Sequence, residues 1–123
     1  MSSDCEPLRE ACDEVLAILS SMSEAIGKGR GKGTGLARLL REAAYRLGEA
    51  SSECIRGCDN SVEPRCVLSD LADRLQAVMQ GIAIRLDHLG RLNSVAEEEL
   101  AGMLVDALYS LVSSICRYAA SLG

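Results

Sequence analysis

Apolar side chains recur every three or four residues along four long segments of this chain. The spacing is clearest in the first segment, where seven apolar residues fall on one helical stripe: Cys5, Leu8, Cys12, Val15, Leu19, Met22 and Ile26. Such spacing predicts an amphipathic α-helix with one buried face. Strand-like alternation is absent from the sequence, so we expect an all-α protein.

Helices are expected at about residues 4–26, 35–57, 64–89 and 94–121. Residues typical of helix starts stand at their beginnings: the capping-box pairs Ser3–Glu6 and Ser94–Glu97, the N-cap Thr34 and the first-turn proline Pro64. Connections of about four to nine residues between helices about 35 to 42 Å long force sequential neighbours to be antiparallel. The predicted fold is a single up-down-up-down four-helix bundle, with residues 1–123 forming one domain.

The second, third and fourth helices also have predicted inward stripes. In the second helix these residues are Leu36, Leu39, Leu40, Ala43, Leu47, Ala50 and Cys54. In the third they are Leu68, Leu71, Leu75, Val78, Ile82, Leu86 and Leu89. In the fourth they are Leu100, Leu104, Leu108, Leu111, Ile115 and Leu122. The chain has no Phe and no Trp, so small and aliphatic side chains must form the core.

The fourth helix has a second apolar flank beside this stripe, formed by Ala101, Val105, Tyr109, Val112 and Cys116. Its apolar arc is therefore wider than one four-helix core requires. A wide arc can reflect an alanine-rich composition, or it can be covered by another protein surface. We take Ala101, Val105, Tyr109 and Val112 as interface candidates and expect a homo-oligomer or a protein partner.

Six cysteines are predicted to gather at one pole of the bundle: Cys5, Cys12, Cys54, Cys58, Cys66 and Cys116. Cys5 and Cys12 are separated by a helical rise of about 10 Å, beyond the roughly 7 Å between Cα atoms that a disulfide tolerates. The directions of Cys54 and Cys58 suit a shared metal better than a bridge. Bridges between helices, from Cys5 or Cys12 to Cys54, Cys58 or Cys116, are favoured, and fifteen complete pairings are open.

Structural disulfides compete with two other hypotheses for these cysteines: buried thiols in a tight core, and a metal–thiolate site. Zinc and iron–sulfur sites usually contain Cys-x-x-Cys pairs, and this chain has none. Storage of Cu(I) in a helical bundle would be expected to use more than six thiols. We therefore expect disulfides at these six positions and no metal or other cofactor.

The start of the chain shows no basic segment followed by an apolar run, so no secretory signal peptide is recognised. No segment has the roughly 20 mostly apolar residues of a membrane span. Disulfides without a signal peptide are typical of intracellular proteins of hyperthermophiles and of virion surfaces. The scarcity of Asn and Gln agrees with heat selection, although two lysines beside eleven arginines do not. We expect a cytoplasmic protein of a hyperthermophile, or a virion-associated one.

Residues 27–35 alternate glycine with Lys28, Arg30 and Lys32 just before a predicted helix N-terminus, where free amides and the helix dipole favour anions. The segment is not a Walker A loop, because Ile26 occupies the position of its first glycine and Gly33 that of its Ser or Thr. It can be a flexible connector, a contact for phosphate or a nucleic-acid backbone, or a protein contact. The net charge of −5 disfavours diffuse attraction to polyanions.

One enzymatic hypothesis comes from Asp70 and Asp73, which share a helix face. Their segment resembles the Glu-x-x-Asp helix of MazG-like all-α nucleotide pyrophosphohydrolases. The resemblance implies clustered carboxylates that hold Mg²⁺ on a nucleoside triphosphate. The preceding helix departs from that family, because Glu42 follows Arg41 and Tyr45 stands where the next acid is expected.

The single histidine, His88, has no adjacent nucleophile, and no catalytic role is expected for it. The sequence therefore favours a non-enzymatic structural or interaction protein, a disulfide-stapled helical bundle that self-associates or binds a partner, for example in an archaeal or viral assembly. The alternatives are a nucleic-acid or phosphate-binding protein that uses residues 27–35, and a MazG-like Mg²⁺-dependent nucleotide pyrophosphohydrolase.

Overall fold

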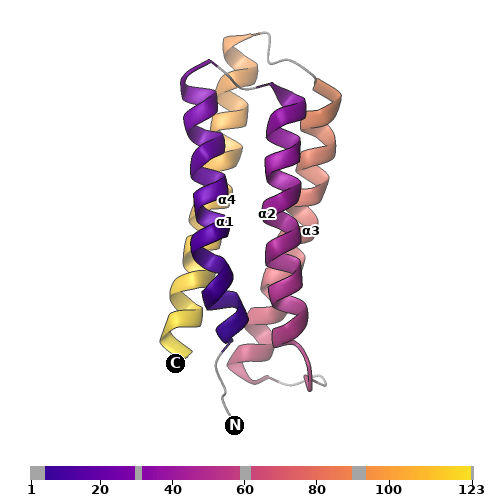
Figure 1. Cartoon of the computed structure of the whole chain (residues 1–123), viewed down its shortest axis with the longest axis vertical. Coiled ribbons are helices and arrows are strands. Elements are labelled where there is room, and N and C mark those ends of the chain that lie inside the picture. The colour runs from indigo at the N-terminus through magenta and orange to yellow at the C-terminus, as the bar shows by residue number, and fades with distance from the viewer. Residues whose placement is uncertain (1–4, 30–31, 59–61, 90–93, 123) are drawn as a thin grey trace.

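The computed structural model describes residues 5–29, 32–58, 62–89 and 94–122. It contains four α-helices: α1 (Glu6–Gly27), α2 (Gly33–Cys54), α3 (Pro64–Leu89) and α4 (Val95–Leu122). The helices run alternately up and down and lie side by side along their whole lengths (Figure 1). The predicted all-α four-helix bundle is confirmed.

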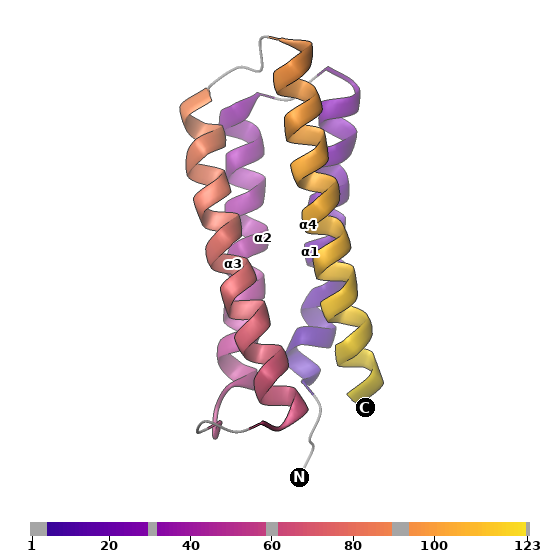
Figure 2. The same cartoon turned by 180° about the vertical axis from the view of Figure 1, so that it is seen from behind.

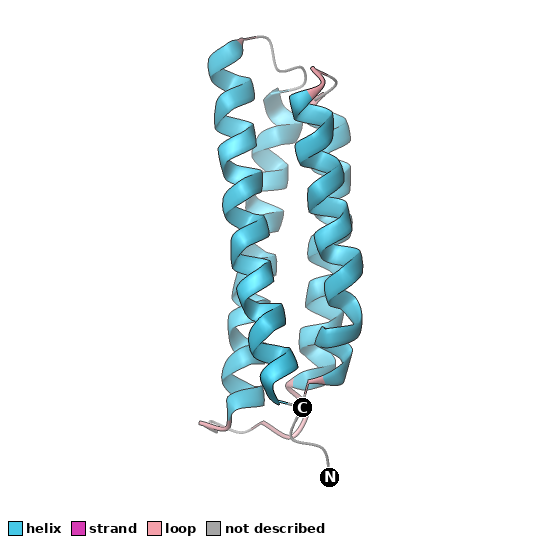
Figure 3. Ribbon diagram, turned by 90° about the vertical axis from the view of Figure 1, so that its left-hand side faces the viewer, coloured by secondary structure: helices cyan, strands magenta, loops and turns pink. Residues whose placement is uncertain are grey.

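Each helix packs against two neighbours, so the four helices form a ring in the order α1, α2, α3, α4. Figures 1 and 2 show α1 beside α4, and α2 beside α3. The view in Figure 3 shows that both described ends of the chain lie at the pole where α2 connects to α3. The pair α2–α3 is the most closely packed and α3–α4 the least closely packed.

The core lies along the axis of the ring and consists of aliphatic, methionine and alanine side chains. Its largest fully buried members are Leu8, Leu19, Met22, Leu40, Leu47, Leu68, Met79, Val15 and Val112. Small residues bring α2 close to α3: a Cβ added to Gly48 would lie 3.3 Å from Gln76 Cγ and Cδ. A core without large aromatic rings is thus filled by moving helices closer together.

Helix boundaries differ from the predictions mainly in α2. This helix begins at Gly33, with Lys32 in an extended conformation at the N-cap and no side-chain cap, so the expected N-cap at Thr34 was wrong. It ends at Cys54 instead of Gly57, because Gly57 has a φ of 79° in the left-handed region. In α1 the helix begins at Glu6, and Ser3 of the predicted capping box lies outside the described residues.

The predicted start of α4 is confirmed by a hydrogen bond. The backbone N–H of Glu97 donates to Ser94 Oγ at 3.1 Å, which is the capping interaction expected of this pair. Helix α3 begins at Pro64, as predicted from the preference of proline for the first turn.

Burial agrees with the predicted stripe in α1, where all seven stripe residues are buried. In α2 the predicted residues are buried except Leu39, which is partly buried and packs against the core. In α3 three predicted core residues are about half exposed: Leu71, Val78 and Leu89. Ala72 and Met79, which follow Leu71 and Val78 in the sequence, are fully buried instead, and so is Ala83.

Helix α4 differs from the prediction in part: Leu108 of the predicted inward stripe is buried, but most of the predicted outer flank is buried as well. The interface candidates Ala101, Val105 and Val112 are buried in the core of the bundle, and only Tyr109 is exposed. The prediction that these residues form a spare outer surface is therefore wrong for the first three. Small side chains beside Leu108 face the core because they let α4 lie close to α1, and Leu100 and Leu111 lie at the edge, about half exposed.

Among the described helices, α4 is the one that is long and apolar enough to cross a membrane by length and composition. In the bundle its buried face packs against α1, Ile115 and Leu122 are partly buried against the core, and Leu100, Met103 and Leu111 are exposed.

Two leucines about one turn apart in α4 test which face of this helix is buried in the core. Leu108 is 3% exposed and Leu111 is 52% exposed. We expect Leu108→Ala to lower the free energy of unfolding by about 2 to 5 kcal/mol, because it leaves a cavity, and Leu111→Ala to lower it by less than about 1 kcal/mol. Urea unfolding of dilute protein, followed by circular dichroism, measures both. Equal losses would contradict the observed face.

Candidate functional site

Three disulfides pair all six cysteines and leave no free thiol. Cys5 bonds to Cys54, Cys12 to Cys116, and Cys58 to Cys66. The Cα separations are 5.5, 5.9 and 5.7 Å, all in the ordinary range for disulfides. The structure thus selects one of the open pairings, and Cys54 and Cys58 bond to different partners instead of sharing a metal.

Each disulfide joins a different pair of neighbouring helices. Cys5–Cys54 ties the start of α1 to the end of α2, Cys58–Cys66 ties the segment after α2 to α3, and Cys12–Cys116 ties α1 to α4. The edge between α3 and α4 has no disulfide, and it is also the least closely packed edge of the ring. Disulfides therefore link three edges of the bundle. The fourth edge, between α3 and α4, has none, and we call it the open edge.

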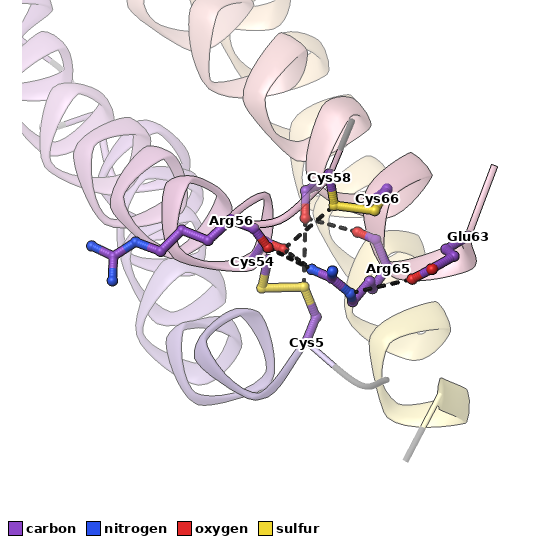
Figure 4. Close-up of polar contacts among 8 residues, drawn as sticks. Cys5, Cys54, Arg56, Cys58, Glu63, Arg65 and Cys66 are labelled. Atoms are coloured by element: carbon purple, nitrogen blue, oxygen red, sulfur yellow. Dashed lines mark hydrogen bonds and ion pairs between the residues drawn. A yellow bond between two sulfur atoms is a disulfide. The ribbon is translucent and has the colours of Figure 1, made fainter. Parts of the chain in front are cut away.

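An arginine caps the end of α2 at the cysteine pole. Arg65 Nη1 donates hydrogen bonds to the carbonyl oxygens of Cys54 at 2.7 Å and Arg56 at 3.1 Å, and its Nε lies 3.5 Å from Glu63 Oε2 (Figure 4). These bonds satisfy carbonyls that a helix end leaves without intrahelical partners. Sequence reasoning missed this role; the only signal was a cation placed directly after Pro64, where α3 begins beside the end of α2.

The predicted anion-binding residues do not form one cluster in the described part of the chain. Lys28 Nζ forms an ion pair with Glu24 Oε1 at 2.6 Å, Lys32 is exposed at the N-cap of α2, and Arg30 lies outside the described residues. Phosphate or nucleic-acid binding by this segment stays a prediction.

The carboxylates of the pyrophosphohydrolase hypothesis have local partners. Asp70 Oδ2 accepts a hydrogen bond from Arg74 Nε at 2.9 Å, which raises the pKa of Arg74, and Asp73 accepts one from Gln76 at 3.2 Å. Within the described ranges, no group of three or more His, Cys, Asp or Glu side chains is placed to hold a metal ion. The geometry gives no support to a Mg²⁺ site here.

Other charged groups have structural partners. Arg46 of α2 forms ion pairs with Glu42 at 3.3 Å and with Glu14 of α1 at 2.8 Å, and the hydrogen bond from Arg46 to Glu42 is the main cause of the raised pKa of Arg46. His88 Nδ1 lies 2.9 Å from the carbonyl oxygen of Ile84 one turn earlier in α3. These contacts lie within α2, within α3 and between α1 and α2, and they stabilise those helices and that pair.

Several exposed apolar side chains, in contrast, belong to the two helices of the open edge. We call this set the α3–α4 apolar face; its members are Leu71, Val78 and Leu89 of α3, and Leu100, Met103, Leu111 and Tyr118 of α4. Each is between about 46% and 69% exposed. Soluble monomers rarely present contiguous apolar surface of this kind without a use for it.

Helix geometry places these residues on the facing sides of α3 and α4, except Met103, which is two residues from the buried Ala101 and lies on the outer side of α4. On α3, Gln76 faces Gly48 of α2, and Leu71 is five residues away, which turns it about 140° from that side. On α4, Gly102 and Cys116 face α1, through the approach to Ile26 and the disulfide to Cys12. The leucine stripe of α4 lies on the side turned away from α1, toward α3.

Comparisons with known proteins found no matching family model, no matching curated protein and no matching solved structure.

The cysteine state can be measured by mass. All six cysteines are in disulfides, so the unreduced protein should gain no carbamidomethyl group when it is treated with iodoacetamide in denaturant. After reduction, the same protein should gain six carbamidomethyl groups. Intact mass spectrometry measures both. Alkylation of the unreduced protein would contradict the observed pairing.

The three disulfides should differ in their contribution to stability. Cys12–Cys116 closes a sequence separation of 104 residues and Cys58–Cys66 one of 8. By chain entropy, the Cys12→Ala/Cys116→Ala variant should lose about 4 to 5 kcal/mol of unfolding free energy and the Cys58→Ala/Cys66→Ala variant about 2 to 3 kcal/mol. Guanidinium unfolding of both variants tests this order, and a reversed order would refute it.

Proposed function

We propose that the protein is a non-enzymatic structural component, a disulfide-stapled helical bundle that acts by packing its α3–α4 apolar face against a second copy of itself. The observation that carries this proposal is the row of half-exposed apolar side chains along the one edge that no disulfide closes. A rigid bundle with an apolar outer face is suited to building an assembly.

The dimensions of the face support a stable contact. Helices α3 and α4 have 26 and 28 residues. At 1.5 Å per residue and about 10 Å in width each, one whole side of the two helices covers about 800 Å², the area per partner of a standard protein interface, and the apolar face is part of that side. A contact of this size can be stable if its centre is apolar and well packed.

The chemistry of the described residues also favours a binding role. Their thiols are all in disulfides, their histidine hydrogen-bonds locally, and they hold no metal-binding cluster. The proposal therefore assigns the protein to assembly, with the apolar face as its working surface.

Replacing one residue of the face tests this proposal. Leu111→Glu places a charge at the centre of the proposed contact, where its desolvation is costly. We expect the wild-type chain to show at least twice its monomer mass by light scattering at high concentration, and Leu111→Glu to be monomeric with an unchanged helical spectrum. Val62→Glu is the matched control, because Val62 is 90% exposed near the cysteine pole and outside the face.

A wild-type chain that stays monomeric at every concentration would contradict the proposed function. Equal loss of association in the Val62→Glu control would show that added negative charge alone prevents association, without a role for this face.

A further inference from the structure

Two charges of opposite sign interrupt the otherwise uncharged stretch of α4. Between residues 100 and 122 only Asp106 and Arg117 are charged, and both are exposed. Neither forms an ion pair with any other described residue, although Arg117 Nη2 donates a hydrogen bond to Ser114 Oγ at 3.2 Å. They are eleven residues apart, which is three turns, so they lie on the same side of the helix and about 16 Å apart along its axis.

From this spacing we infer that two copies pair through α4 in antiparallel orientation, with Asp106 of each chain against Arg117 of the other. The inference rests on the proposed function, since it specifies how the second copy binds. A two-fold axis perpendicular to two antiparallel helices brings the same edge of each together and reverses their direction. One contact then gives two identical ion pairs.

The leucine stripe of α4 selects the same centre. Pairing Asp106 with Arg117 places the two-fold axis midway between them, beside Leu111. In that register Leu111 lies level with Leu111 of the second copy, to within one residue. Leu104 likewise lies level with Tyr118 of the second copy, and Leu100 with its Leu122. The charges lie on one edge of the outer surface of α4 and the leucines on the other. Both edges therefore match the same edge of the second copy about a single two-fold axis.

The middle of this surface permits close approach. Near the proposed two-fold axis, the exposed residues between the two edges are Ala107, Ser110 and Ser114, and the larger Met103 lies farther along the same strip toward the start of α4. Helix pairs with small side chains at the contact reach the short end of the usual 8 to 10 Å interaxial distance. The leucines on one edge and the charges on the other can then contact their counterparts.

Electrostatics favours this orientation over the parallel one. In a parallel pair each residue would lie level with its own copy, so that Asp106 would face aspartate and Arg117 would face arginine. The chain carries a net charge of −5, which repels a second copy, but the stretch from residue 100 to 122 has one charge of each sign. The contact is therefore placed where repulsion between copies is weakest.

Charge reversal tests the register. Asp106→Arg alone and Arg117→Asp alone each turn both ion pairs into like-charge pairs, and we expect the dimer dissociation constant to rise about tenfold for each. The double variant Asp106→Arg/Arg117→Asp restores opposite charges and should return to near the wild-type value. An equimolar mixture of the two single variants should form mixed dimers at near wild-type affinity.

Sedimentation equilibrium gives the dissociation constants, and circular dichroism confirms that each variant is folded. The mixture keeps the test valid if the double variant fails to fold, because the ion pairs are then restored between two single variants that each fold alone. Wild-type dimers with single variants that associate equally well would overturn this register and leave the proposed self-association standing. A wild-type chain that stays monomeric, including one that floats with phosphatidylcholine vesicles instead, would overturn both.

Discussion

The disulfide between Cys12 and Cys116 connects the first helix to the last and so closes the ring of helices. With Cys5–Cys54 and Cys58–Cys66, it leaves the α3–α4 edge as the one neighbouring pair without a disulfide. The other features of the molecule depend on this distribution. Helix α4 lies close to α1, α3 lies close to α2, and the apolar side chains between α3 and α4 are only half covered.

The sequence predicted the fold and the whole inner face of α1, because the stripe from Cys5 to Ile26 is narrow and charged residues surround it. It failed on α4, where apolar residues cover most of the circumference. Size was a poor guide there: of the leucines assigned to the core only Leu108 is buried, and Ala101, Val105 and Val112 lie in the core beside it. Choosing between two apolar stripes requires the distance to the neighbouring helix, which depends on tertiary packing.

The cysteine pole was predictable as a place but not as a set of bonds. Helix lengths put the six cysteines at one end, whereas the pairing depends on where α2 stops. Because α2 ends at Cys54, Cys58 lies beyond the helix and is able to reach Cys66. The cap formed by Arg65 likewise depends on a turn around Gly57 that the periodic pattern does not describe.

The closed ring also determines how the protein would carry a mechanical load. A pulling force that enters the chain before Cys12 and leaves it after Cys116 passes through their disulfide. The roughly hundred residues between them are then shielded from extension, since a covalent bond bypasses them. Both described ends of the chain lie at the same pole (Figure 1). A chain loaded at its two ends would therefore extend only in the segments outside this disulfide, while the bundle between Cys12 and Cys116 keeps its length.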